Sequence, residues 1–173
     1  AYHDDEWGRQ THDDQKHFEL LCLEGAQAGL SWQTILNKRE AYREAYDNFD
    51  PKKVARYDEA KVQSLLQNAG IVRNQLKIRS SIKNAQIFLE LQNEFGSFDA
   101  YIWAYVDGKP LVNHFKKASD LPAKTSISEK ISKDLHKRGM RFIGPTIMYA
   151  YMQSAGLVWD HLEDCYLYKK SSK

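Results

Sequence analysis

The feature that most constrains the fold is a long amphipathic stretch between Arg73 and Asn93. Its apolar residues recur at steps of three and four, and Phe88 widens the apolar stripe; the recurring residues are Ile78, Ile82, Ala85 and Leu89. This spacing is typical of one face of an α-helix. Hydrophobic residues make up 42% of the 173 residues, which is enough to bury an interior around such a face. We therefore expect a long helix here.

Further helices are signalled by residues that cap helix N-termini. These residues are Thr11 or Asp13 before one helix, Ser31 before a helix that runs through Tyr42, Asp50 with Pro51 before another, and Asp58 before a helix that stops near Gly70. Two more helices are expected at about 126–138 and 145–156. Strand signals are scarce, so we predict an all-α fold. We expect a single globular domain over residues 1–173, with its helical core at about 12–156.

Two glycine-bearing connections predict helix-turn-helix hairpins. One is LLQNAGIVRN around Gly70, and the other is KRGMRFIGPTIMYAYM, where Gly144, Pro145 and Thr146 start a helix after a basic approach. A helix start presents backbone N–H groups and the positive end of the helix dipole, which suits a phosphate. A purely structural helix start fits the same pattern.

The charge of the whole chain does not indicate a nucleic-acid binder, because 25 Lys and Arg face 23 Asp and Glu. The distribution is uneven, however. From Lys116 to Arg141 there are eight basic residues against three acidic ones. This segment is either the solvated face of a helix or a surface for nucleic acid.

A single carboxylate poses the main chemical question. Glu24 occurs in LCLEGAQAGLSW, among apolar and small residues that pack closely in a helix. A buried carboxylate without a partner is costly and ordinarily takes up a proton. A cationic ligand removes that cost, so Glu24 is a candidate recognition group for a positively charged molecule.

Cysteine and histidine spacing suggests a metal only weakly. The two cysteines are far apart, which fits a reducing, cytoplasmic setting better than a disulfide framework. His161 and Cys165 are four residues apart, a spacing that can place both on one Zn²⁺. A structural zinc needs four ligands, and His3 is the other candidate. An incidental pair is the alternative.

Four segments and one later cysteine carry a resemblance to a known family. YHDDEWG, LCLEGAQAGLSWQTILNKRE, NAGIVRNQLKI and RGMRFIGPTIMYAYMQSAGLVWDH, followed by Cys165, resemble the DNA-3-methyladenine glycosylase I family of bacteria. The resemblance runs from residue 1 to 168. It implies a helix-hairpin-helix DNA glycosylase of base-excision repair, with a structural zinc.

The resemblance implies three zinc ligands in this chain, His3, His161 and Cys165. It implies a fourth, a Cys, upstream of residue 1. The metal would join an N-terminal segment of about 1–10 to a C-terminal segment of about 157–168. Asp160 precedes a ligand, so it is either a partner that orients the imidazole of His161 or a charge at a helix end.

The resemblance also implies a base pocket. Glu24 is expected to bind the N6/N7 edge of 3-methyladenine, and it is the one candidate for a catalytic group. Tyr2 and Trp32 are expected to form aromatic walls, where a cationic ring gains about 0.5 to 2 kcal/mol. Gly29 and Leu30 are expected to reach DNA, with Leu30 as a wedge in the base stack. Ordinary core positions are the alternative for Trp32, Tyr2 and Leu30.

The implied activity is removal of 3-methyladenine from alkylated double-stranded DNA by base flipping and hydrolysis. A lysine at the position of a Schiff-base nucleophile is not found, which predicts a monofunctional enzyme without strand cleavage. We expect a monomer. The main alternative is a non-catalytic DNA-binding module of the same fold with a degenerate pocket. A more distant alternative is a helical metalloenzyme that acts on a small molecule.

Overall fold

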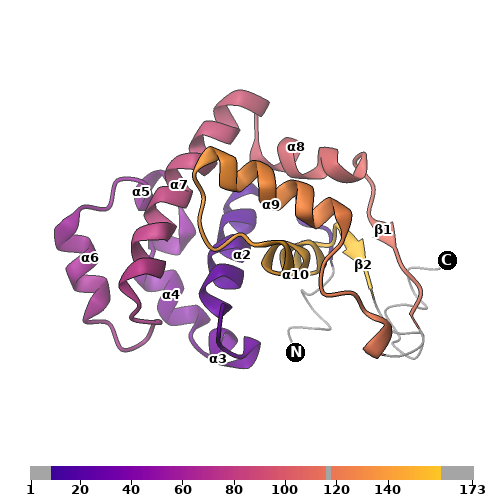
Figure 1. Ribbon diagram of the computed structural model, residues 1–173. Coiled ribbons are helices and arrows are strands. Elements are labelled where there is room, and N and C mark those ends of the chain that lie inside the picture. Colours follow the sequence, from indigo (N-terminus) through magenta and orange to yellow (C-terminus); the bar gives the residue numbers. More distant parts are fainter. Residues whose placement is uncertain (1–8, 116–117, 161–173) are drawn as a thin grey trace.

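The computed structural model describes residues 9–115 and 118–160, and most of these residues are helical (Figure 1). In chain order the elements are α2 (Asp14–Gln27), α3 (Trp32–Asn37), α4 (Arg39–Ala45), η1 (Asp47–Phe49), α5 (Pro51–Val54), α6 (Glu59–Leu66), α7 (Gln75–Phe95), α8 (Phe98–Trp103), η2 (Ala104–Val106), β1 (Leu111–Val112), η3 (Ala118–Asp120), α9 (Ser126–Arg138), α10 (Pro145–Ala155) and β2 (Val158–Trp159). The predominantly helical fold predicted from the sequence is confirmed.

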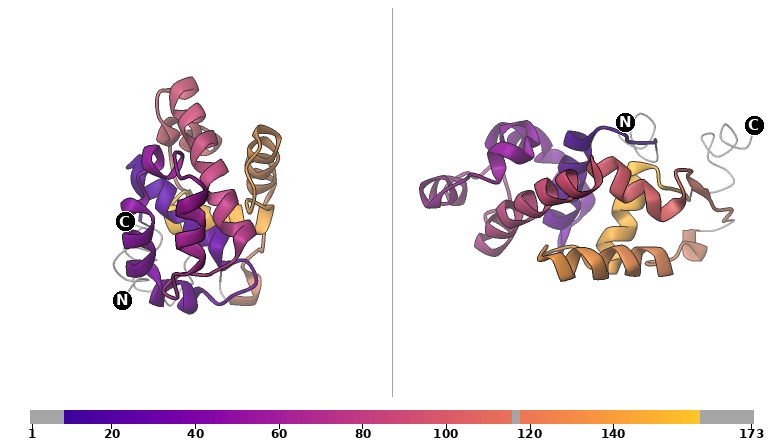
Figure 2. Two further views of the ribbon diagram at one scale, coloured as in Figure 1. Left: turned by 90° about the vertical axis from the view of Figure 1, so that its left-hand side faces the viewer. Right: turned by 90° about the horizontal axis from the view of Figure 1, so that it is seen from above.

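Helix α2 runs through the centre of the molecule. It packs against α3, α7, α8 and α10, while α9 covers α10 and α5 and α6 pack against α7. Figures 1 and 2 show α5 and α6 at one end of the molecule and the two short strands at the other. The α2 residues Phe18, Leu20 and Leu23 are each only 1% exposed, so α2 is fixed by packing on several sides. Among the described helices, none is long and apolar enough to cross a membrane.

Most predicted caps form as expected. Asp13 accepts a hydrogen bond from the N–H of Gln15, Ser31 from that of Thr34, Asp50 from that of Lys52 and Asp58 from that of Lys61. The long helix and the helices at 126–138 and 145–156 are confirmed as α7, α9 and α10, to within two residues at either end.

Two helix boundaries differ from the prediction. The single helix expected from Ser31 through Tyr42 is divided at Lys38, whose backbone has a ψ of 0° and whose N–H closes α3 on the carbonyls of Ile35 and Leu36. The helix expected to stop near Gly70 ends at Leu66 instead, and a loop leads to the cap of α7 at Asn74. Both predicted hairpins are present, but the one around Gly70 has this longer loop.

Two short strands accompany the helices, in keeping with the scarcity of strand signals in the sequence. Strands β1 and β2 pair in parallel, with Leu111 opposite Val158, and the N–H of Leu111 donates to the carbonyl of Leu157 at 2.8 Å. Each strand is two residues long. A segment this short cannot show the alternating pattern that identifies a strand in a sequence.

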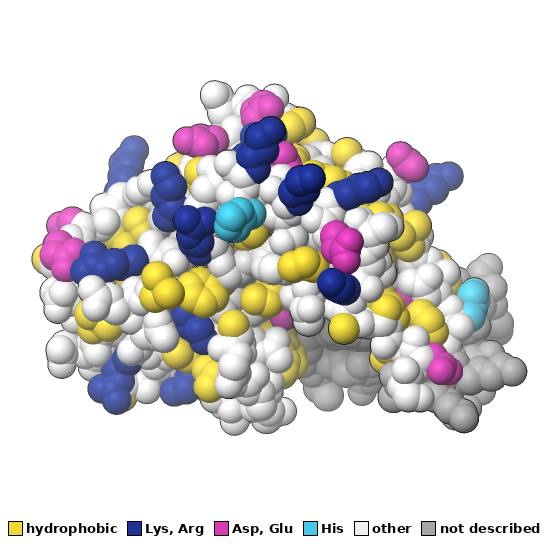
Figure 3. All heavy atoms as spheres, viewed as in Figure 1, with side chains coloured by type: hydrophobic (Ala, Val, Ile, Leu, Met, Phe, Trp, Pro, Cys, Tyr) yellow, Lys and Arg dark blue, Asp and Glu magenta, His cyan; other side chains and the backbone are white. Residues whose placement is uncertain are grey.

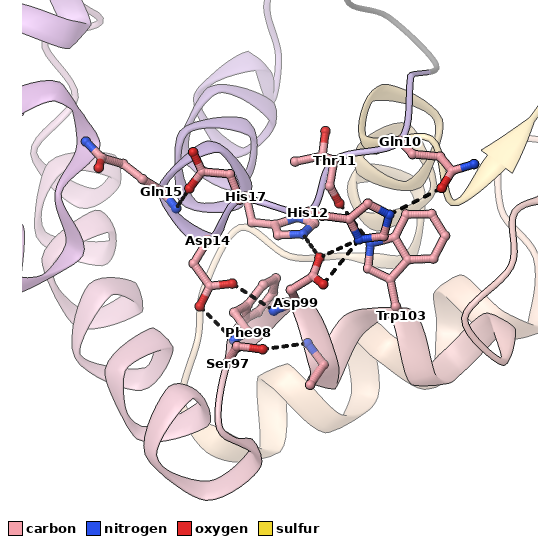
Figure 4. Close-up of polar contacts among 12 residues, drawn as sticks. Gln10, Thr11, His12, Asp14, Gln15, His17, Ser97, Phe98, Asp99 and Trp103 are labelled. Atoms are coloured by element: carbon pink, nitrogen blue, oxygen red, sulfur yellow. Dashed lines mark hydrogen bonds and ion pairs between the residues drawn. The ribbon is translucent and has the colours of Figure 1, made fainter.

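A polar network fastens α8 to α2 (Figure 4). Asp14 accepts hydrogen bonds from the backbone N–H groups of Phe98 and Asp99, both at 2.9 Å, and so caps α8 from another helix. His17 is fully buried, and its Nε2 lies 2.9 Å from Asp99 Oδ1 while its Nδ1 contacts the Tyr151 hydroxyl. Burial lowers the pKa of His17 although Asp99 opposes the shift. The network therefore ties α2 to α8 and α10 around a buried imidazole.

Candidate active site

Glu24 lies in the last two turns of α2 and is 3% exposed. The hydroxyl of Ser154 on α10 donates a hydrogen bond to Glu24 Oε1 at 2.7 Å. No ion pair reaches Glu24 from any residue that the structure describes. Glu19, five residues earlier on α2, is also buried, but it binds Arg39 at 2.6 Å and Arg43 at 2.8 Å. The same helix therefore carries one carboxylate neutralised within the fold and one that is not.

Burial of Glu24 raises the pKa of its carboxyl group to about 7, although the Ser154 hydrogen bond opposes this shift. The cause is loss of hydration, which disfavours the charged form. Near neutral pH the group thus exists in both ionised and protonated forms. A cation placed against it would favour the ionised form and lower its pKa.

A cavity of about 170 Å³ opens beside this carboxyl group. We call it the Glu24 cavity; its lining residues are Glu24, Gln27, Trp32, Ala150, Gln153 and Ser154. Three elements meet here: the C-terminal end of α2, the first residue of α3 and the C-terminal half of α10. The cavity thus combines one carboxylate, one indole ring and several neutral hydrogen-bonding groups, a set suited to a flat, positively charged ring.

The hydrogen bond from Ser154 offers a test of this charge balance. We expect Ser154→Ala to raise the pKa of Glu24 further, because burial remains and the one opposing hydrogen bond is lost. Binding of a cationic base should then weaken by about tenfold at pH 7 and recover toward pH 9, as the carboxyl group ionises. Titration of the variant by ¹³C NMR of the Glu24 carboxyl, with Ser132→Ala as a control on α9, would check the shift. An unchanged pKa would contradict it.

The other predicted pocket and wedge residues fall in one connection. Trp32 is the first residue of α3, partly buried against the core, and lines the Glu24 cavity. Gly29 has a φ of +82°, a conformation that glycine adopts without strain. Leu30 is 40% exposed, so the alternative of a core leucine is wrong. We call residues 28–31 the Leu30 loop; it carries an exposed apolar side chain beside the cavity.

The basic hairpin has the predicted geometry. Helix α9 ends at Gly139 with a φ of +110°, and α10 begins with Gly144 as N-cap and Pro145 as its first residue. Gly144 has no side chain to cap the first turn, and Thr146 is exposed. We call residues 139–144 the hairpin loop. The first-turn N–H groups of α10 have no acceptor within the helix and no side-chain cap, as a phosphate-binding helix start requires.

Basic side chains gather over α9 and the neighbouring part of α7, on the face shown in Figure 3. Within the described part of the predicted basic segment, the exposed basic residues are Lys124, Lys130, Lys133, Lys137 and Arg141. Arg138 instead pairs with Glu94 and Asp134, and Lys124 pairs with Glu129. The described part of the segment is therefore partly a solvated helix face and partly an ion-pair network.

The predicted metal ligands His3, His161 and Cys165, and the predicted aromatic wall Tyr2, lie outside the described residues. Within residues 9–115 and 118–160, no group of three His, Cys, Asp or Glu could hold a metal ion. Asp160 follows β2 and is 2% exposed; it binds Asn113 at 2.6 Å and the Tyr149 hydroxyl. Its carboxylate is thus held by the helical body, next to the predicted ligand His161.

The sequence did not single out Gln27, Gln153 and Ser154. Ser154 is 130 residues from Glu24 along the chain, and serine near a helix C-terminus is common. The one available signal was spacing: Gln27 follows Glu24 by three residues, which places it on the same face of α2.

Comparison with known proteins finds a family match over most of the chain. A family model described as methyladenine glycosylase matches residues 1–168. A protein named DNA-3-methyladenine glycosylase from Haemophilus influenzae is 49% identical over 164 residues, covering 95% of this chain and 89% of the relative. DNA-3-methyladenine glycosylase 1 of Escherichia coli is 46% identical over 168 residues, covering 97% and 90%.

Solved structures of similar proteins have the same fold as this chain. A crystal structure of 3-methyladenine DNA glycosylase I has a TM-score of 0.93 and 45% identity, covering 96% of this chain and 91% of that one. A structure of the Staphylococcus aureus enzyme, described as showing how it recognises 3-methyladenine, has a TM-score of 0.93 and 39% identity, covering 95% and 87%. The resemblance seen in the sequence is confirmed, and the chain belongs to the methyladenine glycosylase family.

Proposed function

We propose that this enzyme flips 3-methyladenine out of alkylated duplex DNA and hydrolyses its glycosidic bond without cutting the strand. The observation that carries the proposal is the buried carboxylate of Glu24, which faces a cavity and has no cationic partner among the described residues. Membership of the family supports this reaction class. Recognition, leaving-group chemistry and DNA contacts each follow from residues of this chain.

Recognition rests on charge. Methylation at N3 of an adenine in DNA produces a purine with a delocalised positive charge. Glu24 would accept a hydrogen bond from the N6 amino group at the N6/N7 edge of that purine, and Trp32 would present its ring to the cationic face. Undamaged adenine is neutral, so it leaves the buried carboxylate uncompensated.

The leaving group makes the bond cleavage easy. When the bond between the sugar C1′ and N9 breaks, its electron pair returns to the cationic ring, and the base departs neutral. A water molecule supplies the new C1′–O bond and loses a proton to solvent. The protein need not protonate the base, so its main task is to extrude and orient the nucleotide. Glu24 is thus primarily a recognition group in this proposal.

DNA contacts would come from two loops. The start of α10, at Gly144, Pro145 and Thr146, would hold a backbone phosphate, and this contact carries no sequence information. The Leu30 loop would place Leu30 in the gap left by the flipped base, with Gly29 allowing close approach. Such a division suits an enzyme that finds one damaged base in any sequence.

A release assay tests the proposal directly. We expect the protein to free 3-methyladenine from methylated duplex DNA while leaving the strands intact until alkali is added. Chromatography would measure the free base, and denaturing gels would measure strand breaks before and after alkali. Breaks without alkali would overturn the monofunctional assignment. Absence of free base at every protein concentration would favour the non-catalytic DNA-binding module instead.

We also propose a structural zinc held by His3, His161 and Cys165 with an upstream Cys. Its chemical basis in the described part of the chain is the buried side chain of Asp160, the residue before His161, which accepts hydrogen bonds from Tyr149 and Gln153 of α10. A closed site of this kind would stabilise the fold and take no part in the reaction. It would also exclude the small-molecule metalloenzyme, which needs an open coordination position.

A further inference from the structure

Helix α7 touches both loops to which the proposed function assigns DNA contacts. Lys77 and Asn84 are seven residues apart, so they lie on one face, two turns and roughly 10 Å apart along the axis. Together with Ser80 and Ser81 they form a polar stripe at positions i, i+3, i+4 and i+7. This stripe is turned inward, and it lines one narrow crevice with Gly25 of α2 and Phe142 of the hairpin loop.

Asn84 holds the hairpin loop by two hydrogen bonds to one residue. Its Nδ2 donates to the carbonyl of Arg141 at 2.8 Å, and its Oδ1 accepts from the Arg141 N–H at 2.9 Å. A side-chain amide offers this donor and acceptor together, whereas a carboxylate offers acceptors alone. The next residue, Phe142, has a φ of +57°, which is uncommon for a bulky residue. The clamp thus fixes the loop immediately before its strained residue.

Lys77 holds the Leu30 loop in a similar way. Its Nζ donates to the carbonyl of Ala26 at 2.9 Å and to that of Ala28 at 2.7 Å. These carbonyls lie at the C-terminal end of α2, where backbone acceptors lack helical partners and the helix dipole favours a cation. Ala28 directly precedes Gly29 and Leu30. Lys77 therefore fixes the backbone from which the predicted wedge projects.

Direct packing leaves little freedom between these two loops. A Cβ at Gly25 would lie 3.3 Å from both the Cβ and the carbonyl oxygen of Phe142, which is tighter than ordinary van der Waals contact. Gly25 is the neighbour of Glu24 in α2. The hairpin loop, the C-terminal end of α2 and the polar stripe of α7 therefore meet as one rigid junction beside the Glu24 cavity.

We propose that Asn84 and Lys77 are positioning residues that hold the hairpin loop and the Leu30 loop at one fixed separation. When the phosphates of a duplex bind at the start of α10, this fixed separation places the damaged nucleotide where it can reach both Leu30 and the Glu24 cavity. This inference rests on the proposed function for its consequence but not for its geometry. Neither residue lines the Glu24 cavity, so neither is expected to touch the base.

Two substitutions test the inference, each with a matched control. Asn84→Ala is compared with Asn93→Ala, an exposed asparagine on the same helix, and Lys77→Met with Lys53→Met, an exposed lysine on α5. Three measurements are made on each variant. Fluorescence anisotropy measures affinity for a duplex with a tetrahydrofuran abasic analogue, calorimetry measures binding of free 3-methyladenine, and release kinetics give KM and kcat. We expect each test variant to lose about tenfold in duplex affinity and to raise KM comparably. Free-base affinity and the control variants should stay within about twofold.

Other outcomes separate positioning from simple folding. Lys77→Arg, which retains a cation with several donors, should restore most of the duplex affinity. Duplex affinity at the parental level in both test variants would overturn the proposal, as would an equal loss of free-base binding. Amide hydrogen exchange tests the clamp without measuring activity. The backbone amide of Arg141 should exchange slowly in the parent and rapidly in Asn84→Ala. An unchanged exchange rate would overturn the assignment of Asn84 as the residue that holds the hairpin loop. A parent that released no base would overturn the proposed function alone.

Discussion

Replacing Glu24 by Gln should lower kcat/KM for release of 3-methyladenine by about 10- to 100-fold at pH 8. At that pH the parental carboxyl group is mostly ionised, because its pKa lies at about 7. The glutamine side chain keeps the shape and the acceptor for Ser154. It lacks the charge that compensates a cationic purine, and its amide nitrogen would oppose the donors of the base edge. Single-turnover kinetics on methylated duplex, in which the base is still cationic, would measure the effect.

Binding of undamaged duplex shows whether the loss of activity in Glu24→Gln is specific to the damaged base. Affinity for undamaged duplex should change by less than about twofold in Glu24→Gln, since the phosphate contacts are expected at α10 and not in the cavity. Glu44→Gln, which removes an exposed carboxylate from α4, serves as the control for a change in net charge. Equal losses of affinity for methylated and undamaged duplex would contradict the assignment of Glu24 to base recognition.

The pH dependence of the parent should follow the same carboxyl group. Recognition of the cationic base in methylated duplex, measured as kcat/KM for its release, is expected to weaken as the pH falls through about 7, because protonation of Glu24 removes the charge that attracts that base. The parent and Glu24→Gln should therefore become similar near pH 5. This convergence is specific to a titrating recognition group, since a purely steric role would separate the two proteins equally at every pH.

Local signals predicted the helices well because their causes are local. Asp13, Ser31 and Asp58 cap the N–H groups of residues two or three positions away, and the apolar stripe of α7 needs nothing beyond its own spacing. The division of the helix at Lys38 was not predictable in this way. The strands β1 and β2 were missed because each owes its form to a partner 47 residues distant.

The residues of the site also separate into those that the sequence alone could identify and those that it could not. Glu24 stood out because a charge among small apolar residues is anomalous in the sequence alone. Ser154, Asn84 and Lys77 are ordinary helix residues, and their partners become known only when α10, the hairpin loop and the end of α2 are brought together. The sequence analysis of the long helix concerned its apolar stripe alone, and it assigned no role to the polar residues. Four of them line the crevice at the junction with α2.

The two buried glutamates of α2 should respond in opposite directions to the same substitution. Glu19→Gln should destabilise the protein by about 3 kcal/mol at pH 7, because it leaves Arg39 and Arg43 without their shared carboxylate in a buried setting. For a chain of this size, that is a fall in Tm of about 10 °C. Thermal unfolding followed by circular dichroism would measure it, and an unchanged Tm would contradict the structural role of Glu19.

Glu24→Gln should instead stabilise the protein at pH 8, by up to about 3 kcal/mol, because burial raises the carboxyl pKa from 4.5 to about 7. A group whose pKa is higher in the folded state contributes stability below the unfolded value and loses it as the pH rises through the folded value. The gain of the variant should therefore vanish below pH 4.5. For Glu19 the pKa is lowered to about 2, so its contribution is complete above pH 4.5 and is lost as the pH falls through 2. Unfolding free energies of both variants at pH 5 and pH 8 would test this. A Glu24→Gln variant less stable than the parent at pH 8 would show that Glu24 is satisfied within the fold, which would remove the physical reason for a cationic ligand.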